Sequence, residues 1–357
     1  MNYIKSDGLG YFFQTRHPEE PLSCHCEARS AEAISKQARD KLRDEGSVKR
    51  MHYLMDTFLS IEAFHSDEDR AKKAVEDAFR EAARIESVLS RFREDSQIYR
   101  INNYSFGKSC VITKELANLI STCIEFSRKA GGAFDITVAP LMELWANAAK
   151  QNIIPLPNEI SALLQNTGYE NIILDSESST IVFTKPLLRI DFGAVGKGYA
   201  LDRMAEILKE DRIENARLDF GGHLYYMNSQ GYEGEAVGIR NPLYPDEAIK
   251  AVTIKNQSIS TSANYEKNFN VLGRTYSHLI NPCTGQPVET DVLSVSVISD
   301  SGLVSDILST AVFILGLKKS MELIEDMGNV EAVIICKDKD GKCTKIHKLE
   351  GRRSFGS

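Results

Sequence analysis

Apolar and polar residues alternate along residues 58–64, which is the pattern of a strand buried on one face. From residue 66 to residue 92 the spacing changes, and apolar residues recur every three or four positions. This spacing predicts an amphipathic helix, with Ser66 and Asp69 in position to cap its N-terminus. The first elements that the pattern clearly predicts are therefore a strand and a long helix after it.

The same patterns predict the remaining elements. Helices are expected at about 114–129, 159–165, 197–209 and 302–315, and strands at 172–174, 180–183, 187–191, at several places between 216 and 259, at 293–298, and in a hairpin of 332–336 and 344–347. Gly131-Gly132 and Gly316 would close two of the helices, and Asp340-Gly341 would form the hairpin turn. Helices and strands in this mixed order favour an α+β fold over a regular βαβ array.

Residues 1–50 differ from the rest of the chain. The tract Cys24-His25-Cys26 lacks the second pair of ligands that a zinc site needs, and the charge-rich segment up to Arg50 has no apolar face. Without an apolar core it does not read as a signal peptide. We expect a poorly ordered extension over 1–50, with Met51 or Met55 as the more natural start, followed by a single domain over 51–357.

Composition narrows the function classes. The chain has 42% hydrophobic and 26% charged residues and a formal net charge of −7. This acidic balance argues against a nucleic-acid partner, and no apolar run approaches the roughly 20 residues of a transmembrane segment. Seven cysteines without a framework spacing are typical of a reducing compartment, so we expect a cytoplasmic location for the chain as written. Any phosphate site on so acidic a protein needs local cations or a metal.

A glycine-rich turn lies at residues 190–200, where an apolar strand runs into Gly193, Gly196 and Gly198 and then into a helix. Exposed N–H groups at a helix start attract phosphate, and Lys197 would add a cation. The order of glycines is G-x-x-G-x-G, which differs from the Rossmann fingerprint. The Asp191-Phe192-Gly193 triplet lacks the other kinase motifs. The segment is either a phosphate site or a turn that needs glycine for steric reasons.

Asp306 and Thr310 lie four residues apart in the helix predicted at 302–315, so their side chains share one face. A carboxylate and a hydroxyl are hard oxygen donors that suit magnesium. The same pair would also fit the polar stripe of a half-buried helix.

His278 precedes the turn-rich segment Asn281-Pro282-Cys283-Thr284-Gly285. Its ordinary pKa near 6.5 makes histidine a natural general base, although a lone histidine is often structural. Asp135, in Gly132-Ala133-Phe134-Asp135, would either accept hydrogen bonds from a heterocycle or cap the short helix that follows.

Taken together and in this order, these segments resemble the ApbE family, the FAD:protein FMN transferases, from about Met55 to Ile335. The resemblance rests on Met55-Asp56-Thr57, Leu89-Ser90-Arg91-Phe92, Gly132-Ala133-Phe134-Asp135, the run from Asp191 to Asp202, Asp219-Phe220-Gly221-Gly222, Ser260-Thr261-Ser262, Ser277-His278-Leu279-Ile280-Asn281-Pro282 and Ser305-Asp306 with Thr310. It implies an α+β fold of two sheet-and-helix halves resembling the tunnelling fold.

The resemblance also implies roles for individual residues. Family positions that hold FAD correspond to Met55, Phe92, Ala133, Phe134, Asp135, Asp191, Lys197 and Ile280. The magnesium ligands correspond to the Ala194 carbonyl, the Asp306 carboxylate and the Thr310 hydroxyl, and the proposed base corresponds to His278. Two positions depart from the family: Asp56 stands where glycine is usual, and His223 stands where a small polar residue is common.

The expected function is therefore the Mg²⁺-dependent transfer of FMN from FAD to a threonine or serine of a target flavoprotein subunit, with release of AMP. Two alternatives stay open: an FAD pyrophosphatase that gives FMN and AMP, and a flavin-binding protein without catalysis. A Rossmann dehydrogenase conflicts with the order of the glycines.

Overall fold

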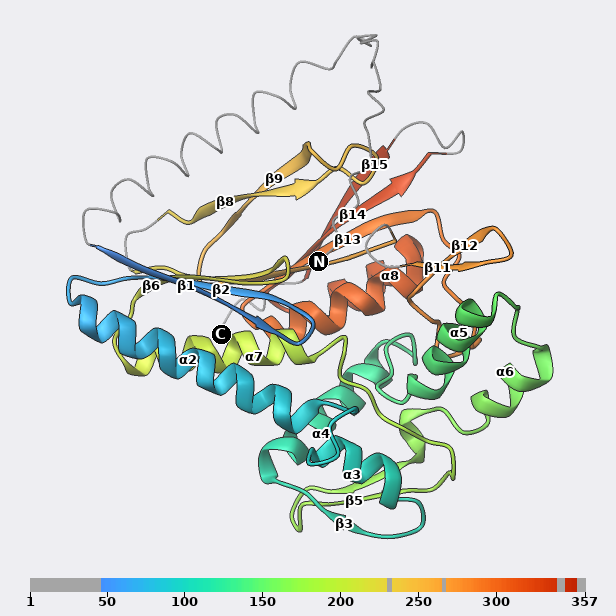
Figure 1. Ribbon diagram of the computed structural model, residues 1–357. Coiled ribbons are helices and arrows are strands. Elements are labelled where there is room, and N and C mark those ends of the chain that lie inside the picture. Colours follow the sequence, from blue (N-terminus) through green and yellow to red (C-terminus); the bar gives the residue numbers. More distant parts are fainter. Residues whose placement is uncertain (1–45, 230–232, 265–267, 339–343, 352–357) are drawn as a thin grey trace, which may run out of the picture.

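The centre of the molecule is an eight-stranded antiparallel sheet (Figure 1). The computed structural model describes residues 46–229, 233–264, 268–338 and 344–351. In spatial order the strands are β1 (Ser47–Leu54), β2 (Thr57–Phe64), β6 (Asn215–Phe220), β7 (His223–Met227), β10 (Ser258–Ala263), β13 (Val292–Ser299), β14 (Val330–Lys337) and β15 (Thr344–Glu350). Every neighbouring pair is antiparallel. This arrangement confirms the α+β prediction.

Three helices cover one face of this sheet: α2 (Glu68–Leu89), α7 (Gly196–Glu210) and α8 (Gly302–Glu325) (Figure 1). Their apolar stripes and the facing strand residues form the main hydrophobic core. A hairpin of β8 (Glu235–Arg240) and β9 (Ala248–Ile254) lies over the opposite face, where Ile259 and Ile298 belong to a second cluster. The helix layer is the one that carries the candidate site.

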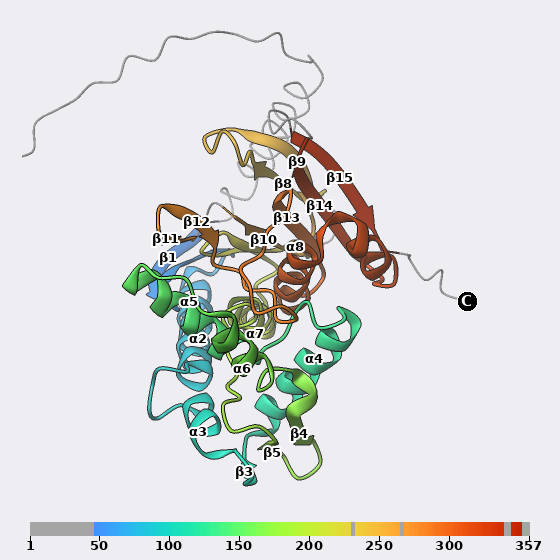
Figure 2. The same ribbon diagram turned by 90° about the vertical axis from the view of Figure 1, so that its right-hand side faces the viewer.

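The second half lies beyond the helix layer (Figures 1 and 2). It contains α3 (Gln97–Tyr104), α4 (Lys114–Lys129), α5 (Ala139–Gln151), α6 (Pro157–Leu164) and the short sheet of β3 (Cys110–Val111), β5 (Thr180–Phe183) and β4 (Ile172–Asp175). The hairpin of β11 (Asn268–Val271) and β12 (Arg274–Ser277) contacts α5 and lies to the side, level with α8 in Figure 1. Trp145, Ile160 and Ile280 form a small third cluster there. The predicted two halves are therefore present. Within the described residues, no helix is long and apolar enough to span a membrane.

The strand predicted at 187–191 is wrong. This stretch makes one isolated bridge, between Arg189 and Val138. The side chain of Asn102 takes the place of a neighbouring strand: its Oδ1 accepts from Ile190 N at 2.8 Å, and its Nδ2 donates to Ile190 O at 2.9 Å. Because a side chain satisfies the backbone of Ile190, the segment needs no strand partner.

Two helix boundaries also differ from the prediction. The first long helix begins at Glu68, because Asp67, and neither Ser66 nor Asp69, accepts a hydrogen bond from Arg70 N. The helix at 302–315 continues to Glu325, since Gly316 (φ 73°, ψ 172°) produces a kink and the helix resumes beyond it. Glycine can adopt this backbone conformation without a steric penalty.

The N-terminal boundary lies earlier than expected. Residues 47–50, predicted as part of the extension, belong to β1 and pair with residues 61–64 of β2. The hairpin of β14 and β15 is present as predicted. Residues 1–45, which include Cys24-His25-Cys26, and the Asp340-Gly341 turn lie outside the described residues.

Helices α7 and α8 cross at two glycines. A Cβ atom on Gly302 would lie 2.6 Å from Gly198 O, and one on Gly198 would lie 2.8 Å from Asp306 Cβ and overlap with the Gly302 carbonyl oxygen. In addition, Asp202 of α7 accepts hydrogen bonds from Gly302 N at 2.5 Å and Leu303 N at 3.0 Å at the start of α8. The main chains of the two helices are thus in direct contact.

Gly198→Ala is expected to lower the free energy of unfolding by about 1–3 kcal/mol, because the added methyl group must push two main chains apart. Urea unfolding of the full chain measures this change. Lys209→Ala on the exposed side of α7 is the control and should stay within about 0.5 kcal/mol of the parent. Equal stability of Gly198→Ala and the parent would contradict the close crossing.

Candidate functional site

Asp306 is the buried carboxylate at the centre of the site. It lies one turn into α8 and is only 4% exposed. Its Oδ2 accepts a hydrogen bond from Gly198 N at 3.0 Å, and its Oδ1 accepts one from Ser260 Oγ at 3.2 Å. Asp306 thus connects the start of α7, strand β10 and helix α8.

The glycine-rich turn predicted as a phosphate site leads directly into the N-terminus of α7. No side chain at Val195 caps this helix, but Gly196 N already donates to Phe192 O at 2.7 Å and Gly198 N donates to Asp306 Oδ2. Because Gly198 donates to Asp306, both Lys197 and the turn that contains Ala194 are held close to that carboxylate. Thr310 follows Asp306 by one helical turn and is half-buried.

Asp306 stays ionised although it is buried. Burial raises the pKa of this carboxyl, but the positive charge of Lys197, together with the polar neighbours His223 and Gly198, outweighs burial and lowers the pKa well below its usual range. The charge of Asp306 is therefore present throughout the neutral range. A buried carboxylate that remains charged is a suitable ligand for a divalent cation.

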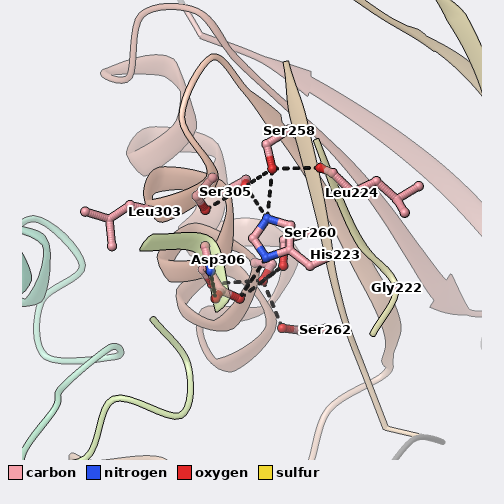
Figure 3. Close-up of polar contacts among 12 residues, drawn as sticks. Gly222, His223, Leu224, Ser258, Ser260, Ser262, Leu303, Ser305 and Asp306 are labelled. Carbon is pink, nitrogen blue, oxygen red and sulfur yellow. Dashed lines mark hydrogen bonds and ion pairs between the residues drawn. The ribbon is translucent and has the colours of Figure 1, made fainter. Parts of the chain in front are cut away.

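A group of serine hydroxyls surrounds Asp306 on the side of the sheet (Figure 3). Ser258, Ser260 and Ser262 alternate along β10, so all three face α8. Ser309 Oγ lies 3.3 Å from Ser260 Oγ and 3.0 Å from Ser262 Oγ. The surroundings of Asp306 are therefore rich in hard oxygen atoms.

His223, at the start of β7, reaches into the same group and is 2% exposed. Its Nε2 lies 2.8 Å from Ser258 Oγ and 3.1 Å from Ser305 Oγ, and its Nδ1 lies 3.7 Å from Asp306 Oδ1 (Figure 3). The sequence singled out His223 only as a departure from a family pattern. Its contact with Asp306 depends on the pairing of distant strands, which local patterns do not encode.

Asp191 also stabilises the glycine-rich turn at residues 190–200. Its Oδ2 pairs with Arg91 Nε at 2.7 Å, and its Oδ1 accepts from Gly193 N at 2.7 Å. The Arg91 guanidinium also lies over the ring of Phe92, 4.4 Å from its centroid, and Phe92 is 74% exposed. An exposed aromatic ring beside the turn is available to a flat ligand.

Met55 lies at the turn between β1 and β2. Met55 N donates to Glu86 Oε1 at 2.7 Å, and a Cβ atom on Gly196 would lie 3.8 Å from Met55 Sδ, so the turn reaches the start of α7. Asp56 follows with φ at 59°, in the left-handed region that glycine adopts freely and aspartate tolerates. The observed backbone explains why glycine would fit this position.

Asp135 holds a loop together in this structure. Its Oδ1 accepts from Thr137 N at 2.8 Å and from Thr137 Oγ1 at 2.7 Å, and its Oδ2 accepts from Tyr169 N at 2.8 Å. Ala133 and Phe134 are buried beside it. Helix α5 begins at Ala139 with Val138 as its N-cap and no side-chain cap, so Asp135 does not cap that helix and instead joins the loop before it to Tyr169.

His278 lies directly after β12 and is half-buried. The loop that follows packs against the segment before Asp135, because Cys283 Sγ donates to Gly131 O at 3.7 Å. Ile280 is buried in the small third cluster, so its side chain packs within the protein. Asp191 N, in turn, donates to Ile136 O at 2.7 Å. The segments that carry the predicted site residues are therefore neighbours in space.

A comparison of the sequence with known protein families covers the segments described above. The ApbE family model matches residues 55–334. The chain belongs to the ApbE family. The sequence had predicted this membership, which is confirmed.

Relatives and solved structures of the ApbE family agree with this assignment. The FAD:protein FMN transferase of Escherichia coli strain K12 is 31% identical over 264 residues, covering 71% of this chain and 74% of the relative. That of Treponema pallidum is 29% identical over 282 residues, covering 74% and 78%. The predicted enzyme class, a transferase, is confirmed by these relatives.

The fold agrees with ApbE proteins of known structure. The ApbE protein of Thermotoga maritima superposes with a TM-score of 0.76 at 28% identity, covering 85% of this chain and 97% of that protein. The flavin transferase ApbE of Vibrio cholerae gives a TM-score of 0.75 at 25% identity with the same coverage. Both structures share the α+β architecture described above.

Proposed function

We propose that this chain transfers the FMN moiety of FAD to a threonine or serine hydroxyl of a target flavoprotein, in a reaction that depends on Mg²⁺ and releases AMP. Membership in the ApbE family and relatives named FAD:protein FMN transferase support the reaction. The observation that carries the proposal is the ionised, buried Asp306 bonded to the start of α7, directly after the glycine-rich turn.

The residues present fit a magnesium ion. Asp306 supplies a carboxylate that stays charged, Thr310 supplies a hydroxyl one turn further along α8, and Ala194 supplies a main-chain carbonyl in the adjoining turn. All three are hard oxygen donors of the kind that Mg²⁺ prefers. When bound, Mg²⁺ acts as a Lewis acid for the phosphoryl oxygens.

The protein groups have separate tasks in this reaction. The Lys197 ammonium at the start of α7 attracts the pyrophosphate of FAD, which offsets the repulsion from a net charge of −7. The exposed ring of Phe92 offers a stacking surface to the isoalloxazine. These contacts position the substrate, which is the main requirement of phosphoryl transfer.

His278 accepts the proton of the attacking hydroxyl. The hydroxyl oxygen forms a bond to the phosphorus of the FMN half, the bond between that phosphorus and the bridging oxygen breaks, and AMP departs with the electron pair. A positioned base of this kind contributes about 10²–10⁴-fold to the rate.

Incubation of the full chain with FAD, Mg²⁺ and a candidate flavoprotein subunit, followed by intact-mass spectrometry, tests the proposal. We expect a covalent FMN adduct on the subunit, AMP in solution, and no adduct when the metal is chelated. FMN and AMP without an adduct would indicate a pyrophosphatase. FAD binding without any turnover would indicate a flavin-binding protein, and either outcome would overturn the proposed transfer.

A further inference from the structure

Strand β1 forms one edge of the central sheet, and no other strand of the described residues pairs with its outer side. It is drawn in blue in Figure 1 and ends at Leu54, where the turn of Met55 and Asp56 leads back into β2. An edge strand of eight residues presents a row of main-chain donors and acceptors to any other strand. Proteins usually cover or interrupt such an edge, so the open side of β1 requires an explanation.

The pairing of β2 shows which main-chain groups of β1 point outward. Gly221 N donates to Phe58 O at 3.0 Å, so the main chain of Phe58 is directed away from β1. In an antiparallel pair, two opposite residues either exchange hydrogen bonds or both direct these groups to their other sides. Tyr53 lies opposite Phe58 and therefore directs its N–H and C=O outward, as does Met51 two residues earlier. The main chain of His52, between them, faces β2.

The same stretch of the edge carries apolar side chains that are exposed to solvent. Met51, Tyr53 and Phe58 are 57%, 62% and 61% exposed. The rings of Tyr53 and Phe58 meet edge to face, with their centroids 5.4 Å apart. They lie on the face of the sheet away from the helices, because the alternate side chains of β2, such as Leu59, belong to the main core. Exposed apolar side chains gathered in this way are typical of a protein-binding surface.

The exposed edge leads to the candidate site. The turn after β1 reaches the start of α7, where a Cβ atom on Gly196 would lie 3.8 Å from Met55 Sδ. In Figure 1 this turn points toward the side on which the β11–β12 hairpin lies, and Figure 2 shows β1 and that hairpin on the same side of the molecule. His278 follows this hairpin directly. A segment that runs along β1 and continues past the turn therefore approaches the start of α7.

The opposite end of β1 is basic. Lys49 and Arg50 are exposed, and neither forms an ion pair with a carboxylate in the described part of the chain. Glu62, which lies opposite Lys49 on β2, is 3.6 Å from Arg217 and pairs with that residue. Two cations without a partner on a chain of net charge −7 favour an acidic residue in whatever segment binds there.

We propose that β1 is the docking edge for the acceptor flavoprotein. An extended segment of that protein pairs with β1 as an added strand, brings an acidic residue to Lys49 and Arg50, covers Tyr53 and Phe58, and carries the acceptor threonine or serine past the turn to the start of α7. Main-chain pairing supplies affinity in this mode of recognition, and the exposed side chains select the partner's sequence. The inference rests on the proposed function and names the surface that recognises its protein substrate.

Met51→Pro tests the main-chain pairing. Proline removes the outward N–H of residue 51, and an edge strand tolerates this because the group bonds to no other strand of the sheet. We expect the KM for the acceptor to rise by about tenfold, since one hydrogen bond is lost and the ring occupies the space of the incoming carbonyl. The KM for FAD and kcat should stay within about twofold of the parent. Met51→Ala, which keeps the N–H group, is the matched control and should raise the acceptor KM by less.

Lys49→Glu tests the charge at the far end of the edge. We expect the acceptor KM to rise by about three- to tenfold at low salt and by less at high salt, because the interaction is between exposed charges. Lys345→Glu makes the same charge change at an exposed position of β15, on the other edge of the sheet, and should stay within about twofold of the parent. Thermal unfolding of each variant shows whether the fold is retained.

Residue-resolved amide hydrogen exchange of the full chain identifies what occupies the edge. The amides of Met51 and Tyr53 should exchange rapidly in the free chain, and both should slow by about tenfold or more when the flavoprotein subunit that accepts FMN is added without FAD. The amide of His52, which faces β2, should change little. Protection of Met51 and Tyr53 in the free chain would mean that another segment of the chain covers the edge. Protection that grows with protein concentration would mean that a second copy does, and either result would overturn the inference.

The kinetic outcomes separate this inference from the proposed function. A parent chain that forms the FMN adduct, together with a Met51→Pro variant of unchanged acceptor KM, would overturn docking at β1 and leave the transfer reaction intact. A parallel rise in the KM for FAD and for the acceptor would also overturn it, because the substitution would then have disturbed the site itself. A parent chain that forms no adduct would overturn the proposed function, and the docking inference with it.

Discussion

Asp306→Asn is expected to lower the rate of FMN transfer by about 10³-fold and to abolish its dependence on Mg²⁺. Stabilisation by a metal ion is worth several kcal/mol, and each 1.36 kcal/mol corresponds to a tenfold change in rate. Asparagine has nearly the same shape as aspartate and its oxygen can still accept from Gly198 N, so the crossing of α7 and α8 is kept. The substitution therefore removes the charge with little change in packing.

The measurements are the rate of adduct formation over a range of Mg²⁺ concentrations and the affinity for Mg²⁺ by calorimetry. Asp326→Asn, at the exposed C-terminal cap of the same helix, is the matched control and should behave as the parent. Urea unfolding of both variants separates a loss of chemistry from a loss of fold. Undiminished, Mg²⁺-dependent transfer by Asp306→Asn would refute the assignment of this carboxylate.

His278→Ala is expected to retain FAD binding and to slow transfer by about 10²–10⁴-fold, the contribution of a general base. In the proposed reaction the imidazole acts on the acceptor hydroxyl, whereas Lys197 at the start of α7 attracts the phosphates, so only the transfer step depends on His278. Fluorescence titration with FAD and the single-turnover rate of adduct formation measure the two effects separately.

His65→Ala removes another partly exposed histidine and serves as the control for His278→Ala. A weak binder of FAD with a normal single-turnover rate would indicate that His278 contributes to the flavin site. A variant that matches the parent in both measurements would show that another group accepts the proton.

Local sequence patterns predicted most of the elements for a physical reason. The alternation at 58–64 and the spacing after residue 66 reflect one buried face of a strand and of a helix, and both faces meet in the main core. The prediction of a strand at 187–191 was wrong because the side chain of Asn102, far away in sequence, forms the hydrogen bonds of the Ile190 main chain. Such a contact leaves no trace in the local pattern.

The candidate site was only partly predictable from local signals. The spacing of Asp306 and Thr310 places both side chains on one face of a helix. An apolar run followed by glycines predicted the turn that leads into α7. The contact between Asp306 and His223 requires β7 and β10 to be neighbours beneath α8. The alternating serines of β10 were a usable signal, since hydroxyls on the buried side of a strand indicate a polar interior.

The Gly198–Gly302 crossing and the small third cluster differ in the amino-acid substitutions that they can tolerate. At the Gly198–Gly302 crossing, the main chains of α7 and α8 touch, so no side-chain rotamer can change to accommodate a substitution there. The hairpin that leads to His278 instead rests on Phe269, Tyr276 and Trp145, whose side chains can be exchanged for others of similar volume. Selection for a new acceptor protein can thus remodel the region around His278 while the helices that hold Asp306 stay as they are.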